Sequence, residues 1–523
     1  MQASYIADVS SIGAITEYAD GIMKSNGIAK KLRSEYRLII EEIALRLIGC
    51  ARTKSELTVT STKKHGKLRF DFSCPGSTIL LTSTDEYDIG GVILEEYSDF
   101  LSQSYIGGIN TVYFSTSVSG KPFFISTSVA ILAGIITALI LNSADALDDV
   151  TVFSSIMSVF TKFISAIATP VTFLSLSSAI IHLTMSREKN NHLRSLVTRY
   201  IVFSVSAVLL GDIFARLQYR LFPLFDLSFY VVDPDSFMGS TFLEFVEHSV
   251  PDNLITPLLS DNPLPLLILA VLCGYASVTI FGSEGTALRN GIMSFKALFS
   301  RILELVYKTL PFFVYFAMLS GCQHEGLGYF LRIGYLIVVI SIAIILFAAL
   351  YMLALRITGI KFKDFMHDYG SIILDNLKIG SNILALPYNR RSLRRKTSHS
   401  RSYLDDGLTL GTIVNMNGSS LLTSFFILYL ICSGGIQPEW YVYLSTIAIL
   451  ILLSVGAPNQ PGSFLLVSIV LLKHIGVSDA LVADALIIEA VFGRTSSFLN
   501  SLGDIVSIVI EDRKKKTKSV DSP

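Results

Sequence analysis

Charged residues are scarce in this chain. Asp, Glu, Lys and Arg make up 16% of its 523 residues, whereas a soluble chain of this length normally carries about a quarter. The formal net charge is zero, so the charge balance offers no argument for a nucleic-acid partner. Hydrophobic residues reach 51%, the mean hydropathy is +0.56, and several apolar runs are long enough to span a bilayer. The sequence therefore predicts a polytopic membrane protein.

Disulfide and metal patterns, a signal peptide and an enzyme centre are also missing. The five cysteines show neither a CxxC pair nor metal-ligand spacing, which favours free, buried thiols. No short basic segment followed by an apolar one opens the chain, so no cleaved signal peptide is expected. Without a His/Asp/Ser or metal-ligand constellation, an enzyme has no support in the sequence.

The first 115 residues differ from the remainder. KKLRSEYRLIIEEIALRLIGCA is a charged helical pattern, and KLRFDFSCP and STILLTS alternate as strands do, so residues 1–115 should form a small cytoplasmic α+β domain. The helical segment EYRLIIEEIALRLIGCA, followed by GKLRFDFSCPGS, faintly resembles the ATPase domain of anti-sigma factors and histidine kinases. Leu45 or Arg46 stands where that domain has its magnesium-binding asparagine. We expect a degenerate regulatory or interaction domain with a cytoplasmic partner; a structural role is the alternative.

Charged loops predict how the chain crosses the membrane, because Lys and Arg collect on the cytoplasmic side. The acidic loops 142–150 and 223–261 should face out. Basic segments should face in, and they are 186–199, 289–301, 356–363, 389–401 and the tail 513–523. The run 389–401 indicates topology rather than binding of nucleic acid or anionic lipid. This alternation gives six spans within residues 116–365, with both termini on the cytoplasmic side. We expect the membrane to be a bacterial inner membrane.

Two later apolar segments cannot be simple spans. Segment 371–395 begins and ends beside inside-facing basic loops, so it must enter and return, and Ser381, Asn382 and Pro387 suit its tip. Segment 441–473 is broken by GAPNQPG, whose prolines and glycines interrupt a helix. Spans 405–433 and 480–511 complete a transport core over 366–512. The predicted fold is an α-helical polytopic membrane protein with eight transmembrane helices plus two re-entrant helical hairpins.

Polar residues crowd the middle of the 405–433 span. GTIVNMNGSSLLTSFFILYL (411–430) places Asn415 and Asn417 among apolar residues, where hydrocarbon penalises every unsatisfied amide. The two asparagines therefore predict an unwound turn. Non-helical backbone at membrane depth is tolerated where it lines a cavity or ion path, so the broken elements together predict a transport site.

Several motifs, in order along residues 123–512, resemble those of the dicarboxylate/amino acid:cation symporter family, which includes the glutamate transporters. FTKFISAIATPVTFLSLSSAI (160–180) is similar to the second span, and NMNGSS (415–420) to the Asn-Met-Asp-Gly-Thr signature of the seventh. SVGAPNQPGSF (454–464) resembles the second hairpin tip, NSLGD (500–504) the last-span Asn-x-x-Gly-Asp, and SNILALP (381–387), weakly, the first tip. The resemblance implies an elevator-type symporter that assembles as a homotrimer among membrane lipids.

The resemblance also implies two sodium sites. Carbonyls freed by an unwound helix, together with one carboxylate, suit a hard, dehydrated cation. The residues of the first site would be Gly411, Asn415, Asn500 and Asp504. The second sodium would take backbone oxygens of Ser454, Val455 and Ala457.

A third sodium site of the family should be absent. Asn417 stands where the family usually has aspartate, and Phe203 replaces a hydroxyl beside the retained Ser204. A neutral amide and a phenyl ring make a poor sodium cage. Coupling should therefore use fewer sodium ions than in glutamate transporters.

The substrate end departs from the family's amino-acid branch, whose last span carries an aspartate for the amino group and then an arginine for the distal carboxylate. Aligned on NSLGD, these positions hold Gly493 and Ser496; aligned on GRT, Arg494 is kept and Val491 replaces the aspartate. Neither alignment keeps the amine-binding acid, and Glu489 lies about one turn away. Because guanidinium suits a bidentate carboxylate, Arg494 is favoured as a ligand over pairing with Glu489.

A small carboxylate without an amino group, such as a C4-dicarboxylate, therefore fits best. The predicted substrate residues are Ser381, Asn382, Gly462, Arg494, Thr495 and Asn500. The hydroxyls of Thr495, Ser496 and Ser497 could instead serve helix packing. Two alternatives stay open: a sodium- or proton-driven symporter for acidic or neutral amino acids, and a non-transporting substrate sensor that signals through the N-terminal domain.

Overall fold

The computed structural model divides the chain into two compact units, Met1–Ile125 and Ser126–Pro523. The residues that it describes are 2–28, 30–51, 55–64, 67–79, 94, 101–117, 123–143, 152–189, 193–221, 242–259, 263–434, 440–456, 462–475 and 481–521.

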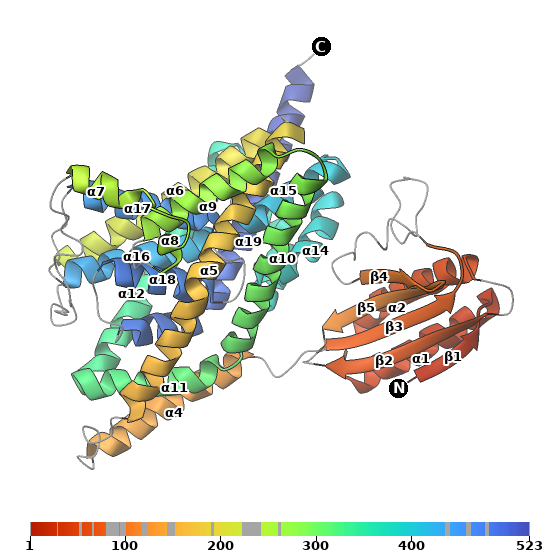
Figure 1. Ribbon diagram of the computed structural model, residues 1–523, viewed down its shortest axis with the longest axis horizontal. Coiled ribbons are helices and arrows are strands. Elements are labelled where there is room, and N and C mark those ends of the chain that lie inside the picture. The colour runs from red at the N-terminus through yellow and green to blue at the C-terminus, as the bar shows by residue number, and fades with distance from the viewer. Residues whose placement is uncertain are drawn as a thin grey trace. The chain divides into compact units, whose positions relative to one another are not determined.

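The first unit is an antiparallel sheet with helices on one face (Figure 1). The strands, in the spatial order β1-β2-β3-β5-β4, are β1 (Gln2–Ile6), β2 (Glu56–Lys64), β3 (Lys67–Pro75), β5 (Ile109–Ser117) and β4 (Leu101–Ile106). Alternation explains the core: Phe70 and Phe72 of β3 are buried with residues of α1 (Ile12–Ser25) and α2 (Lys30–Gly49), while Arg69, the residue before Phe70, is exposed.

Two sequence expectations for this unit change. Of the strand-like segment 77–83, residues 77–79 form no strand, and residues 80–83 lie outside the described part. The five cysteines are free, but of these only Cys74 and Cys322 are fully buried, not all five. Burial raises the pKa of the Cys74 thiol, which disfavours the reactive thiolate.

The described secondary structure of the second unit consists of helices (Figure 1). Its helices are α4 (Phe123–Ser143), α5 (Val152–Lys189), α6 (Leu193–Leu221), α7 (Phe242–Ser249), α8 (Thr256–Leu259), α9 (Pro263–Thr279), α10 (Gly282–Tyr307), α11 (Leu310–Glu325), α12 (Gly328–Ile357), α13 (Phe362–Ile379), α14 (Asn382–Arg394), α15 (Arg401–Val414), α16 (Asn417–Ser433), α17 (Trp440–Gly456), α18 (Ser463–His474) and α19 (Val482–Asp521).

Several helices have the length and apolarity of membrane spans. Within the described residues, four segments satisfy both conditions: 152–185, 193–221, 328–357 and 402–433. Helices α10 and α11, which meet at a bend of 59°, would make a fifth if they form one span. Shorter apolar helices cover 127–143, 263–279, 440–456 and 463–472. The chain is thus an integral membrane protein, and the number of eight spans stays a prediction.

Helix α16 forms the centre of this unit. It is buried along its whole length except for half-buried Cys432, and it packs against α6, α17, α18 and α19. A helix that is apolar all round needs such enclosure, and here neighbouring helices supply it. The polar residues at the start of α16 are therefore held inside the protein.

The break in the first predicted hairpin lies beside Ser381 and Asn382, two of the three residues expected at its tip, but not at Pro387. Helix α13 ends at Gly380, which has φ +60° and donates to the Asn376 carbonyl at 2.9 Å, and α14 starts at Asn382. Pro387, expected at the tip, lies inside α14. A glycine in the left-handed region ends a helix without steric cost, so Gly380 rather than Pro387 makes the turn.

Candidate ion and substrate site

The structure contains the unwound turn between Gly411 and Ser420. Helix α15 ends at Val414 and α16 begins at Asn417, because Asn415 (ψ 62°) and Met416 (ψ 43°) leave the helical conformation. Asparagine favours such breaks, since its side chain competes for backbone hydrogen bonds. The turn is enclosed: Asn415 is 0% exposed.

The side chain of Asn415 connects this turn to α19. Its Nδ2 donates to Asp504 Oδ1 at 2.8 Å and to the Asn500 carbonyl at 3.3 Å. A Cβ added at Gly411 would lie 2.4 Å from Asp504 Oδ1, so only glycine allows this carboxylate to lie against α15. The structure thus brings together the four residues of the first predicted sodium site: Gly411, Asn415, Asn500 and Asp504.

Asp504 is the electrostatic centre of the site. It is 1% exposed, and its Oδ2 has no hydrogen-bond partner among the described residues. A buried carboxylate with only neutral amides beside it is costly unless a cation compensates it. No group of three or more His, Cys, Asp or Glu side chains in the described ranges could hold a metal, so any cation here would depend on one carboxylate and neutral oxygens.

The amide of Asn417 is fully used within the protein. Its Nδ2 donates to Tyr351 Oη at 2.7 Å and to Asn415 Oδ1 at 2.5 Å, and its Oδ1 accepts from Ser204 Oγ at 2.8 Å. Phe203 packs edge-on against the Tyr351 ring, with centroids 5.0 Å apart. These contacts occupy the position where the resemblance would put a third sodium ion.

Helices α16 and α19 approach closely at Gly418. Its N–H donates to Asn500 Oδ1 at 2.7 Å, and a Cβ added there would lie 2.2 Å from the Ser496 carbonyl oxygen. Next along the chain, Ser419 Oγ lies 2.9 Å from Ser463 Oγ and 3.0 Å from Ser496 Oγ. A buried chain of hydroxyls therefore joins α18, α16 and α19 beside the unwound turn.

The predicted residues of the first hairpin reach the same region in part. Asn382 is buried, and its Oδ1 accepts from Ser501 Oγ at 2.8 Å. Half-buried Ser381 forms the break before α14, where its carbonyl accepts from Ala385 N at 3.0 Å. Asn382 thus joins α14 to the helix that carries Asp504.

Arg494 does not pair with Glu489, the alternative weighed from the sequence. Its Nη2 donates to the Lys378 carbonyl at 2.6 Å, and a Cβ on Gly380 would lie 2.5 Å from its Nε. The guanidinium thus lies at the carboxyl end of α13, where the helix dipole stabilises a positive charge. Thr495 is half-buried on the same helix.

The second predicted sodium site is described only in part. Ser454 and Val455 lie in the last turn of α17, where backbone carbonyls lack intrahelical partners. Ala457 lies outside the described residues. Gly462, expected to contact substrate, has φ +92° and instead donates its N–H to Glu489 Oε1 at 3.0 Å.

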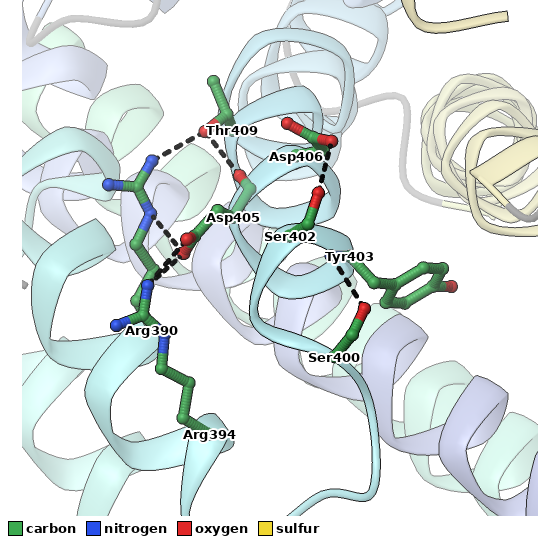
Figure 2. Close-up of polar contacts among 8 residues, drawn as sticks. All are labelled: Arg390, Arg394, Ser400, Ser402, Tyr403, Asp405, Asp406 and Thr409. Atoms are coloured by element: carbon green, nitrogen blue, oxygen red, sulfur yellow. Dashed lines mark hydrogen bonds and ion pairs between the residues drawn. The ribbon is translucent and has the colours of Figure 1, made fainter. Parts of the chain in front are cut away.

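Salt bridges hold α14 against α15 near their basic connection (Figure 2). Arg394 Nη2 donates to both Asp405 oxygens, at 2.6 and 2.7 Å, and Arg390 Nε lies 3.6 Å from Asp405 Oδ1. Arg390 also donates to Thr409 Oγ1 at 2.7 Å. These ion pairs and hydrogen bonds thus connect α14 and α15, which both carry predicted site residues, at a place outside the site.

The sequence reasoning missed two tyrosines. Tyr351 of α12 donates to the Leu499 carbonyl at 3.2 Å besides accepting from Asn417, and Tyr200 of α6 donates to the Gly407 carbonyl at 3.1 Å. Both rings are 0% exposed. A hydroxyl-bearing ring inside an otherwise apolar helix was the available signal.

Comparison with known proteins shows the family of this chain. The model of the sodium:dicarboxylate symporter family matches residues 123–514. The chain belongs to the sodium:dicarboxylate symporter family. A relative, the C4-dicarboxylate transport protein of Deinococcus deserti, is 22% identical over 413 residues, which cover 77% of this chain and 91% of the relative. The family match contains all four residues of the first predicted sodium site.

Proposed function

We propose that this family member is a secondary active symporter that couples sodium to the uptake of a small carboxylate, best a C4-dicarboxylate. The observation that carries the proposal is Asp504, a buried carboxylate beside the unwound turn at Asn415; its Oδ2 accepts no hydrogen bond from the described residues. Membership of a sodium:dicarboxylate family and the name of the Deinococcus relative support the same substrate class.

Two sodium ions at most have sites in this proposal. The first uses Asp504 with oxygens of Gly411, Asn415 and Asn500, and the second uses backbone oxygens from Ser454 to Ala457. The saturated amide of Asn417 supports the lack of a third. The substrate carboxylates would bind near Ser381, Asn382, Arg494 and Thr495.

The proposed molecule is a homotrimer in a bacterial inner membrane, with both termini cytoplasmic. Residues 116–365 would provide the scaffold and the first six spans, and residues 366–512 the moving transport core. Residues 1–115 would form a regulatory domain with a cytoplasmic partner.

Uptake of labelled succinate, fumarate, aspartate and glutamate into proteoliposomes, with and without an inward sodium gradient, tests the proposal. We expect succinate or fumarate to accumulate only with the gradient. Preferential uptake of aspartate or glutamate would favour the amino-acid alternative. Binding without any flux would favour the sensor, and flux independent of sodium would remove the cation assignment.

A further inference from the structure

Glu489 of α19 is a second buried carboxylate, which the proposed ion and substrate sites do not use. It is 2% exposed and accepts three hydrogen bonds. The donors are Gly462 N at 3.0 Å, Leu465 N at 3.4 Å and Tyr307 Oη at 3.3 Å. All three donors are neutral, so Glu489 binds to peptide and phenol groups rather than to a cation.

The two peptide donors belong to the start of α18. The first turn of a helix exposes N–H groups without intrahelical partners, and the helix dipole favours a negative charge there. Gly493 makes room for this anion, since a Cβ added there would lie 2.3 Å from Glu489 Oε1, and Gly462 adopts a left-handed φ of +92° that favours glycine. The side chain of Glu489 thus fills an anion site at the amino end of α18.

This end of α18 also carries Ser463, which reaches the candidate site. Ser463 Oγ lies 2.9 Å from the Oγ of Ser419. Ser419 directly follows Gly418, whose N–H donates to Asn500. Any shift of the first turn of α18 would move this hydroxyl away from α16. Glu489 therefore fixes, from outside the site, the position of a residue within it.

We propose that Glu489 is a positioning residue: a tethered carboxylate, bound by the amino end of α18 and by Tyr307, that holds Ser463 beside Ser419. This goes beyond the proposed function, because the anion concerned is part of the chain and is neither substrate nor coupling ion. It also withdraws the Gly462 N–H from substrate binding, since Glu489 already accepts its hydrogen bond.

Replacement of the tethered carboxylate by a free one tests the proposal. Glu489→Ala leaves three donors around a space that formate, a one-carbon carboxylate, should refill. In nanodiscs, the full-length variant should unfold at a lower temperature than wild type, and sodium formate should raise its midpoint relative to equal sodium chloride. Wild type and Glu304→Ala, a control in which an exposed carboxylate paired with Arg301 and Lys308 is removed, should show no formate effect. No rescue of Glu489→Ala, or equal rescue of wild type, would overturn the proposal.

Transport kinetics distinguish positioning from a loss of folded protein. Glu489→Ala should raise the apparent KM for the transported carboxylate about tenfold, as expected for lost buried hydrogen bonds to a charged group, and formate should lower it again. A fall in maximal rate with an unchanged KM would contradict positioning. The thermal measurement decides even if no carboxylate proves to be transported, so this inference can fail separately from the proposed function.

A milder pair of variants keeps the test decisive if Glu489→Ala does not fold. Glu489→Gln keeps one acceptor oxygen but loses the charge, and Tyr307→Phe removes one donor. Since both act on the same contact, their losses of thermal stability should not add in the double variant. Additive losses would show that Tyr307 and Glu489 act independently and would overturn the proposed arrangement.

Discussion

The amide of Asn417 donates two hydrogen bonds and accepts one, a combination that an aspartate cannot reproduce. Aspartate is nevertheless what the family resemblance leads one to expect at this position. In a buried turn, a change from acceptor-only to mixed donor and acceptor alters which partners can satisfy the group. Here Tyr351 Oη and Asn415 Oδ1 accept the two hydrogen bonds that the amide donates. A neutral side chain whose hydrogen bonds are all made within the protein needs no cation beside it.

Asn417→Asp should therefore destabilise the folded protein. The new carboxylate cannot donate to Tyr351 or Asn415, and an unsatisfied buried charge costs about 1–3 kcal/mol or more. The thermal unfolding midpoint in nanodiscs at low sodium measures the loss. Asn253→Asp is the matched control, because Asn253 uses its Oδ1 to accept from Ile255 N and Thr256 N, which aspartate does equally well. A variant at position 417 as stable as the control would contradict the assigned hydrogen bonds.

The family resemblance pointed to Gly411, Asn415, Asn500 and Asp504, and the structure brings these residues together, while their role in binding sodium stays a prediction. Sequence reasoning missed Tyr351 because the pairing with Asn417 depends on how α12 packs against α16, and the alternation of polar and apolar residues along a single helix cannot reveal that. It placed Gly462 against substrate, whereas the described contacts give its N–H to Glu489.

Helix interruptions and close helix contacts explain the site at the scale of elements. Local signals predicted the break at Asn415–Met416, and the structure has it. The tip before α14 was assigned to Ser381, Asn382 and Pro387; the break occurs at Gly380 and Ser381, and Pro387 lies inside α14. Pro387 is the sixth residue of α14, beyond the first turn where proline is best tolerated, whereas Gly380 adopts a left-handed conformation with the Arg494 side chain packed against it.

Gly418→Ala should separate α16 from α19. The added methyl group would meet the Ser496 carbonyl oxygen at 2.2 Å, and such overpacking typically costs about 1–3 kcal/mol. Gly334→Ala in α12 is the control, since nothing lies within 4 Å of its added Cβ and alanine favours a helix. Thermal unfolding should show a lower midpoint for the first variant alone. Equal midpoints would mean that the two helices do not touch at Gly418.

The contact between α14 and α15 predicts coupling between Arg394 and Asp405. Each single change, Arg394→Gln or Asp405→Asn, removes a two-oxygen ion pair whose side chains are 17% and 24% exposed. We expect each variant to lose about 1–2 kcal/mol of stability, and the double variant to lose much less than the sum. A double-mutant cycle on unfolding free energies measures this coupling energy. A coupling energy near zero would show that the pair contributes nothing to holding the helices together.

The whole chain consists of two units, and every described contact of the candidate site lies within Ser126–Pro523. The predicted boundary near residue 115 came from a change in composition. The number of spans and the trimer depend on the bilayer and on other copies of the chain, which composition does not encode. They remain predictions.

Deletion of residues 1–115 should therefore leave sodium-dependent uptake intact. Uptake by proteoliposomes that contain equal amounts of folded full-length and truncated protein measures the effect. Comparable rates are expected, because every described contact of the site joins residues within 126–523. Loss of uptake in a truncated protein that remains folded would show that the N-terminal unit takes part in transport and would strengthen the sensor alternative.

The apparent sodium affinity of carboxylate uptake in Asp504→Asn tests the central claim most directly. Removing the one buried carboxylate beside the unwound turn should weaken apparent sodium affinity by about tenfold or more, a difference of roughly 1.4 kcal/mol or greater. Glu511→Gln is the control on the same helix, because Glu511 pairs with Arg199 away from the turn. A large loss in Asp504→Asn with little change in Glu511→Gln is the predicted result. An unchanged sodium affinity in Asp504→Asn would contradict the account.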